Sequence, residues 1–359
     1  MKKTTVFLLF LVACITGIFA QPVLKPASSV NEYSLIYELF GGTNAPENKD
    51  SYEENATVTL EVPTRSGYRF DGWYWDEALK EPLPENTFSS KKGALKVYAK
   101  WLKEMDFASF ESENMVEIIP VDNKVTLEDF SGTEGPQDIF AYAISKYEVT
   151  QELYQAVTGS NPSYYKGEKN PVENITLYDA VNFCNELTKI TMGEDNCCYT
   201  ITNISKNSDG NITRATVTWD QSKKGYRLPT EAEWEMAARG GVNGGWDYSY
   251  SGSDNVSEVA WYYWNTSRNP NPVGTKLANM AGLYDMSGNV YELCWSEDLN
   301  PCYRGGSYYS ESNLCTVTSW NWTYSSSCDS TIGFRVCQSL ESRTAPWFLP
   351  PNRYKNMDR

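Results

Sequence analysis

The chain has 359 residues, of which 41% are hydrophobic and 14% aromatic, and this composition at this length predicts two folded domains rather than a disordered chain. The formal net charge of −15 argues against a nucleic-acid partner, because binding a phosphate backbone requires a basic surface. The sequence contains no histidine, so the most common general base is absent and any metal site must use oxygen or sulfur ligands.

Residues 1–20 have the order of a secretory signal peptide. Lys2 and Lys3 precede an apolar run that starts at Val6, and the small residue Ala20 follows it. A second interpretation stays open, because the Leu-Val-Ala-Cys sequence that ends at Cys14 resembles a bacterial lipobox, in which Cys14 would be lipidated. Both routes predict an exported protein, either secreted or held at the cell envelope. No later stretch reaches membrane-spanning length.

A linker at residues 21–32 precedes four short segments that are typical of β-strands. Residues 33–39 and 57–62 alternate apolar and polar side chains, and 67–74 and 95–101 are rich in aromatic residues. The strings YELFGGTN, PTRSGYRFDGWYWD and VYAKW are similar to the Listeria–Bacteroides repeat, a small β-grasp-like module of surface proteins. The resemblance predicts such a module at residues 33–102, with its aromatic side chains in the core and a spacer or adhesive role outside the cell.

The character of the sequence changes from about residue 105. Residues 115–120 and 140–149 are expected to form strands, and two helices have clear start signals. Thr176 with Asp179 three residues later, and Thr230 with Glu233, are the pairs expected at helix N-termini. After the second helix, Gly, Asn, Ser and aromatic residues dominate, which predicts a loop-rich domain on a few strands and helices.

Six ordered sequence blocks resemble the sulfatase-modifying-factor family of formylglycine-generating enzymes. The blocks are YEVTQELYQAVTGSNPSYYKG (147–167), NPVENITLYDAVNFCNELT (170–188), GYRLPTEAEWEMAARGG (225–241), GLYDMSGNVYELC (282–294), RGGSYYS (304–310) and GFRVC (333–337). The resemblance implies an α+β fold with a variant C-type lectin-like head at residues 105–340. The tail at 341–359 has no helical or strand period and is expected to be extended. The same fold serves copper-dependent oxidases, iron sulfoxide synthases and binding proteins, so the fold alone does not fix the activity. The absence of histidine excludes the iron enzymes.

In the oxidases, the resemblance implies a copper(I) site made by two cysteines. Here those positions are Ser310 and Cys315, and Ser307 matches the active-site serine. A serine hydroxyl is a poor ligand for a soft ion, so copper is not expected, and Cys315 is interpreted as a buried small side chain. If the chain were an oxidase, Cys315, Ser307 and Ser310 would be its catalytic positions.

Two further expectations follow from the resemblance. Cys184 occupies the position of one partner of a family disulfide and Cys337 lies one residue from the other partner's position, which predicts a Cys184–Cys337 bridge. The cysteines of the family's second bridge would fall at Ala238 and Trp320, so that pair is absent, and Cys197, Cys198, Cys294, Cys302 and Cys328 have no assignable partner.

The loop from Asp285 to Glu292 matches a calcium loop of the family. The resemblance predicts calcium ligands from the side chains of Asp285 and Glu292 and from the backbone carbonyls of Gly288 and Val290. The alternative is a plain turn in which Asp285 bonds its own backbone.

The preferred hypothesis is an exported protein whose head binds an extracellular protein or glycan. The segment 308–330 has the Tyr, Trp, Ser and Asn content of a ligand-binding surface. The residues expected to contact the ligand are Tyr308, Tyr309, Trp320, Trp322 and Tyr324. The alternatives are a formylglycine-generating oxidase and a variable protein diversified by a retroelement, in which a segment before the GFR sequence is mutated.

Overall fold

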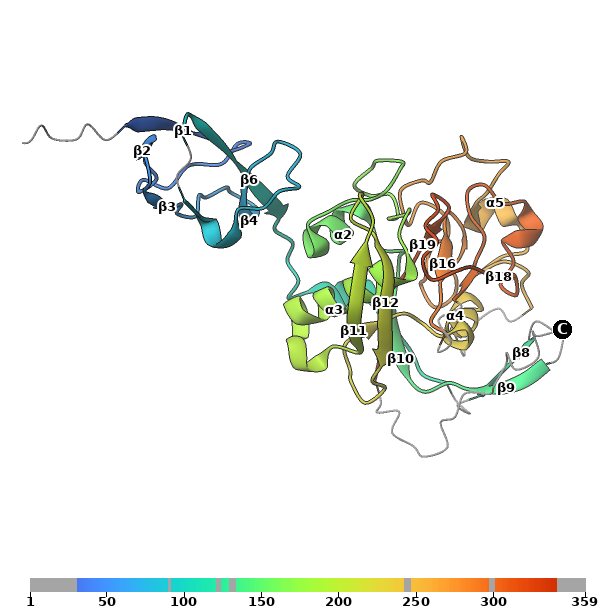
Figure 1. Cartoon of the computed structure of the whole chain (residues 1–359). Coiled ribbons are helices and arrows are strands. Elements are labelled where there is room, and N and C mark those ends of the chain that lie inside the picture. The colour runs from blue at the N-terminus through green and yellow to red at the C-terminus, as the bar shows by residue number, and fades with distance from the viewer. Residues whose placement is uncertain are drawn as a thin grey trace, which may run out of the picture.

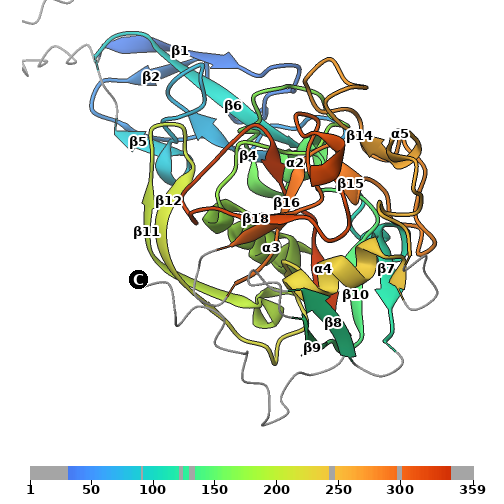
Figure 2. The ribbon, with the colours of Figure 1, turned by 90° about the vertical axis from the view of Figure 1, so that its right-hand side faces the viewer.

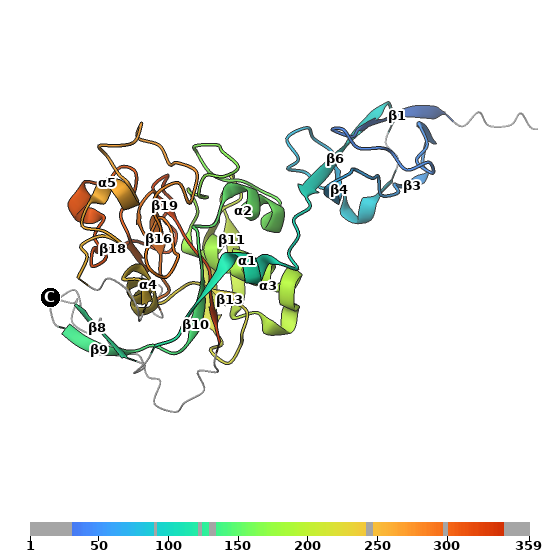
Figure 3. The same ribbon diagram turned by 180° about the vertical axis from the view of Figure 1, so that it is seen from behind.

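The computed structural model describes residues 31–340 except 90–91, 121–123, 129–133, 242–246 and 297–300. The predicted signal peptide, Cys14 and the tail at 341–359 lie outside the described residues. A small N-terminal module stands beside a larger head (Figure 1, Figure 3). In the described part of the chain, no helix has the length and hydropathy needed to cross a bilayer.

The module is a mixed four-stranded sheet in the order β2-β1-β6-β4, with a separate two-stranded ribbon of β3 and β5. The strand β1 pairs parallel with β6, and β2 and β4 are antiparallel to their neighbours. The module strands are β1 (Glu32–Glu38), β2 (Ser51–Glu53), β3 (Thr57–Thr59), β4 (Tyr68–Tyr74), β5 (Thr87–Ser89) and β6 (Leu95–Lys103). All four predicted strand segments are therefore present.

Aromatic rings fill the core of the module. Trp73 is fully buried, and its ring contacts those of Tyr37 and Phe70 at centroid distances of 5.5 and 5.4 Å. Phe70 also contacts Trp101 at 5.6 Å, and the indole of Trp101 leaves no room for a side chain at Gly42. The prediction that these rings are core residues is confirmed.

The last strand of the module connects it to the head. Lys103, at the end of β6, forms an ion pair with Glu152 on helix α2 (Gln151–Thr158) of the head, and Glu152 also pairs with Lys169 at 2.9 Å. Glu152 accepts hydrogen bonds from both ammonium groups, and these lower the pKa of its carboxyl.

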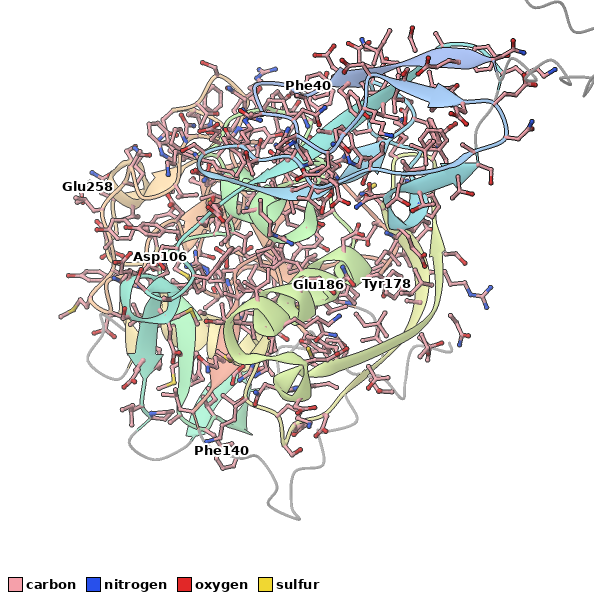
Figure 4. All side chains as sticks on the ribbon, turned by 90° about the vertical axis from the view of Figure 1, so that its left-hand side faces the viewer. Phe40, Asp106, Phe140, Tyr178, Glu186 and Glu258 are labelled. Carbon is pink, nitrogen blue, oxygen red and sulfur yellow. The ribbon has the colours of Figure 1, made fainter. Side chains whose placement is uncertain are left out.

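Two helices of the head begin where the sequence predicts. Helix α3 (Leu177–Met192) starts with a capping box between Thr176 and Asp179, and α4 (Glu231–Ala238) starts with one between Thr230 and Glu233. Two short helices, α1 (Phe110–Asn114) and α5 (Val256–Val259), complete the α-helices of the described residues. Figure 4 labels Tyr178 and Glu186 on α3, and Phe40 on the module above it.

The strands of the head form two four-stranded sheets and several two-stranded ribbons. The sheets have the orders β13-β20-β10-β7 and β18-β17-β16-β19. The strands are β7 (Met115–Ile118), β8 (Lys124–Glu128), β9 (Glu134–Asp138), β10 (Tyr142–Ser145), β11 (Tyr199–Lys206), β12 (Ile212–Trp219), β13 (Tyr226–Arg227), β14 (Ala260–Trp261), β15 (Ser287–Gly288), β16 (Tyr291–Leu293), β17 (Cys302–Arg304), β18 (Trp320–Trp322), β19 (Ile332–Gly333) and β20 (Cys337–Ser339). The sheet of β16 to β19 and helix α5 lie on the side of the head away from the module (Figure 1). This side of the head faces the viewer in Figure 2.

Three buried arginines cross-link the interior of the head. Arg335 binds both carboxylate oxygens of Glu292 at 2.6 Å, and Arg227 binds both of Glu233 at 2.7 and 2.8 Å. Arg304, also buried, pairs with Glu235. Each pair joins segments that are short or irregular, so charge-assisted hydrogen bonds hold the loop-rich part of the fold in place.

The predicted Cys184–Cys337 bridge is not formed in this structure. Both side chains are fully buried free thiols, and burial raises the pKa of each. Cys198 is a third buried thiol in the same group, because it contributes to the raised pKa of both. The family pairing is therefore only one of the pairings open to these cysteines.

Candidate functional site

A continuous row of six aromatic rings lies on the head, and three separate segments supply it. The consecutive ring centroids are 4.9, 5.8, 6.5, 5.7 and 5.0 Å apart. In spatial order, this aromatic row consists of Tyr164, Tyr165, Tyr308, Tyr309, Tyr263 and Trp264.

The row is exposed at its ends and in part of its middle. Trp264 is 70% exposed, Tyr164 74% and Tyr309 55%. Tyr308 differs, since its ring is 2% exposed and its hydroxyl bonds to Ser330. In this structure the burial of Tyr308 does not favour the predicted ligand contact at this ring, and the exposed rings beside it are better placed.

Hydrogen bonds join two of the three segments of the row, those around Tyr263 and Tyr308. The N–H of Tyr308 donates to the carbonyl of Asn289 at 2.7 Å, and the N–H of Tyr263 donates to that of Ser310 at 3.0 Å. The hydroxyl of Thr266 donates to the carbonyl of Tyr308 at 3.1 Å. The exposed rings are thus presented on a bonded framework rather than on free loops.

Two charged side chains accompany the exposed rings. The guanidinium of Arg268 lies 4.7 Å from the ring centroid of Tyr263 and 6.0 Å from that of Tyr309, within cation–π range. The indole N–H of Trp264 donates to the Glu311 carboxylate at 2.8 Å. The surface therefore offers flat apolar faces, one cation and one anion.

A second pair of exposed rings lies farther along the predicted ligand segment. Trp322 is 45% and Tyr324 64% exposed, and their centroids are 5.4 Å apart in an edge-to-face arrangement. Trp320 is partly buried and packs against the hydrophobic cluster around α4. The exposure expected of a ligand surface is present at two of these three rings.

The positions that match the oxidase copper site adjoin Tyr309, whose N–H donates to the hydroxyl of Ser307 at 3.2 Å. The hydroxyls of Ser307 and Ser310 are 3.1 Å apart, and that of Ser310 donates to the hydroxyl of Tyr291 at 2.9 Å. Cys315 is fully buried, and burial raises the pKa of its thiol to about 12. One thiol and two hydroxyls do not fit a copper(I) site made by two thiolates, because a hydroxyl is a poor ligand for a soft ion.

The predicted calcium loop is a tight turn in which Asp285, Gly288 and Asn289 all have positive φ. The carboxylate of Glu292 accepts two bonds from Arg335 at 2.6 Å and one from the indole of Trp234 at 2.7 Å. A cation at Glu292 would have to displace this guanidinium. As arranged, these residues do not fit calcium.

Two further carboxyl groups, those of Asp285 and Glu148, are buried around this loop. Burial raises the pKa of Asp285 to about 6 and that of Glu148 well above its usual value. One Asp285 oxygen accepts from the Gly274 N–H at 2.6 Å, and the other is buried with no hydrogen-bond partner in the described part of the chain. Glu148 accepts bonds from the amide of Asn289 at 2.6 Å and the N–H of Val290 at 3.0 Å. Among the described residues, no group of three or more acidic or cysteine side chains is placed to hold a metal ion.

Sequence reasoning missed most of the aromatic row. Tyr164, Tyr165, Tyr263 and Trp264 fall in two loops far from the predicted ligand segment. The paired aromatic residues at 164–165 and the run of four at 261–264 are the signals that could have drawn attention to them.

Comparison with known proteins fixes the family. The chain belongs to the sulfatase-modifying factor enzyme 1-like domain family, whose model matches residues 108–340, and a Listeria-Bacteroides repeat domain matches residues 33–100. The α+β class is confirmed, and the head has the family's C-type lectin-like fold.

Three proteins that are similar to this chain have names that describe different functions. Chaperone protein LppX of Paenibacillus barcinonensis is 38% identical over 234 residues, which cover 55% of this chain and 75% of LppX. The structure of Treponema denticola variable protein 1 has a TM-score of 0.54 and 31% identity, and the match covers 62% of this chain and 94% of that protein. The formylglycine-generating enzyme of Streptomyces coelicolor is 30% identical over 154 residues, 33% of this chain and 48% of the enzyme. The chain thus spans about half of that enzyme's length.

Proposed function

We propose that this chain is an exported binding protein whose head presents the aromatic row to an extracellular protein or glycan. The observation that carries this proposal is the exposure of Trp264 and Tyr309 on a hydrogen-bonded framework. Rigid aromatic rings with an adjacent arginine provide large contact area at low entropic cost, and they are the residues that dominate binding energy. Single exposed rings are common on protein surfaces. A connected row of rings beside Arg268 and Glu311 is instead typical of an interaction site.

The oxidase alternative is disfavoured by the side chains at the matching positions. Ser310 supplies a hydroxyl instead of the second thiol, and the side chain of Cys315 is fully buried. The Streptomyces relative is similar over less than half of its own length.

The third candidate, a retroelement-diversified variable protein, is favoured by one observation. The similar Treponema denticola protein is named as a variable protein, and the match covers 94% of it. This candidate is compatible with binding, because diversification would act on the exposed segment that contains Trp322 and Tyr324. A reverse-transcriptase gene beside a near-copy of this coding segment would support it, and the absence of both would exclude it.

The binding proposal is tested with arrays of purified glycans and of extracellular-matrix proteins. We expect the full chain to be retained by at least one class of probe, and Trp264→Ala with Tyr309→Ala to reduce retention at least tenfold at an unchanged melting temperature. Tyr248→Ala is the matched control, because Tyr248 is exposed at 40% but lies outside the row. Retention that is equal for the row variant and the wild type would remove the row as the ligand surface.

The oxidase alternative is tested with a Cys-x-Pro-x-Arg peptide and copper(I). We expect no formylglycine from the wild type, and copper(I) binding only after Ser310→Cys restores a second thiol. Formylglycine made by the wild type and lost in Cys315→Ala would overturn the assignment as a binding protein.

A further inference from the structure

Two cysteines face each other across the strands β16 and β17. The register pairs Glu292 with Arg304 and Leu293 with Tyr303. The next residues are Cys294 and Cys302, and the N–H of Cys294 donates to the carbonyl of Cys302 at 2.9 Å. Residues directly opposite on antiparallel strands have Cα and Cβ separations within the range that a disulfide spans.

The surroundings of the pair also favour a bridge. Cys294 is fully buried and Cys302 is 6% exposed, and both belong to the hydrophobic cluster that contains Trp234. After burial, a hydrogen bond between the two side chains is the next cause that raises the pKa of the Cys294 thiol, so the sulfur atoms are neighbours. A buried disulfide leaves no polar group unpaired at this position.

We propose that Cys294 and Cys302 are a modification site that is oxidised to a disulfide when the protein folds in an oxidising compartment. One S–S bond forms as two S–H bonds break, and the two electrons and two protons reduce the disulfide of a thiol–disulfide oxidoreductase to its dithiol. In the structure both side chains are free thiols, which corresponds to the reduced form.

The bridge would lie next to the predicted ligand segment at 308–330. The strand β17 pairs on its other edge with β18, where Cys302 is the register partner of Trp322. A disulfide between Cys302 and Cys294 would therefore link β17, which pairs with the strand of the exposed Trp322, to the end of β16, which contains Glu292. This inference does not depend on the aromatic row binding a ligand.

Peptide mapping of the full chain exported into a bacterial periplasm tests the proposal. Lys276 and Arg304 are successive tryptic sites, so both cysteines fall in one peptide. Without reduction, after denaturation with N-ethylmaleimide, we expect this peptide to carry no label and to be lighter by two hydrogens than the reduced peptide. Further cleavage after Glu292 and Glu297 should leave the fragment with Cys294 joined to the fragment with Cys302 until the sample is reduced. Labelling of both cysteines, or linkage of either to another cysteine, would overturn the proposal.

A stability comparison gives an independent measurement. Because a short loop at 295–301 is closed, Cys302→Ser should lower the melting temperature of oxidised protein by about 5 °C. The melting temperature of reduced wild type should equal that of Cys302→Ser. Cys328→Ser changes an exposed cysteine, and its melting temperature should equal that of oxidised wild type. Equal melting of oxidised and reduced wild type would contradict the bridge, and the peptide map decides even if Cys302→Ser does not fold.

Discussion

The module and the head use the same aromatic residue types in opposite ways. In the module, Trp73 is fully buried and its ring contacts two other rings. In the head, Trp264 and Tyr309 belong to a row of rings of similar spacing but are 70% and 55% exposed. Both parts therefore have rings in contact with one another, and the difference is in the solvent exposure of the rings.

The two parts differ in exposure because they differ in the other contacts that stabilise them. A module of this size buries little surface, so its aromatic rings must supply most of the apolar area. The head instead packs helix α3 into a large hydrophobic cluster and holds its loops with the pairs Arg335–Glu292, Arg227–Glu233 and Arg304–Glu235. Because the head has these other stabilising features, it can leave aromatic rings exposed.

The largest expected effect is at the buried charges of the head. Arg335→Leu leaves Glu292 without its cation beside the buried carboxylates of Glu148 and Asp285, and should reduce the free energy of unfolding by about 5 kcal/mol. Urea unfolding measured by tryptophan fluorescence gives this value.

The matched control for Arg335→Leu is Lys189→Leu. Lys189 pairs with Glu186 on the surface of α3, where such a pair contributes about 0.5 kcal/mol. If the two variants are equally stable, the buried pairs do not hold the head together and the contrast with the module fails.

The next effect is in the module core. Trp73→Ala should destabilise the module by about 4 kcal/mol, because it removes a fully buried ring that two other rings contact. Amide hydrogen exchange, resolved by peptide, should show loss of protection in residues 33–101 while α3 stays protected. Loss of protection in both parts would mean that module and head unfold as one unit.

The sequence allowed much of the fold to be predicted, for local reasons. The two capping boxes at Thr176 and Thr230 mark helix starts that the structure confirms, because a cap is a contact between residues close in sequence. Period-two alternation likewise located β1, since one face of that strand is buried. The family and the α+β class are also confirmed.

The candidate site was predicted less well because its contacts are long-range. Tyr165 and Tyr263 meet the 308–309 segment only after the chain has folded, so composition of one segment could not identify them. The same composition could not show that Tyr308 is buried beneath its neighbours. The partner of Glu292 was missed too, since Arg335 lies in a different sequence block.

A smaller effect on stability is expected in the aromatic row. Trp264→Ala removes a ring that is 70% exposed and one hydrogen bond to Glu311, so the free energy of unfolding should change by less than about 0.5 kcal/mol. Urea unfolding of this variant beside Trp73→Ala measures the contrast between the two parts with one residue type. A loss of several kcal/mol at Trp264 would show that the row is structural and would move the binding surface elsewhere.

The smallest expected effect is that of calcium on the head. Both oxygens of Glu292 are bound by Arg335 and one of them also by Trp234, so an ion at the Asp285–Glu292 loop would have to replace a charge that is already present. We therefore expect the melting temperature to be the same in calcium and in chelator. A bound ion at about 100 times its dissociation constant would instead add about 2.7 kcal/mol, which a thermal melt resolves. If calcium stabilises the wild type by that amount and Glu292→Gln removes the effect, Arg335 must move aside in the calcium-bound protein. The unpartnered oxygen of Asp285 would then be the first ligand to examine, because it needs no such displacement.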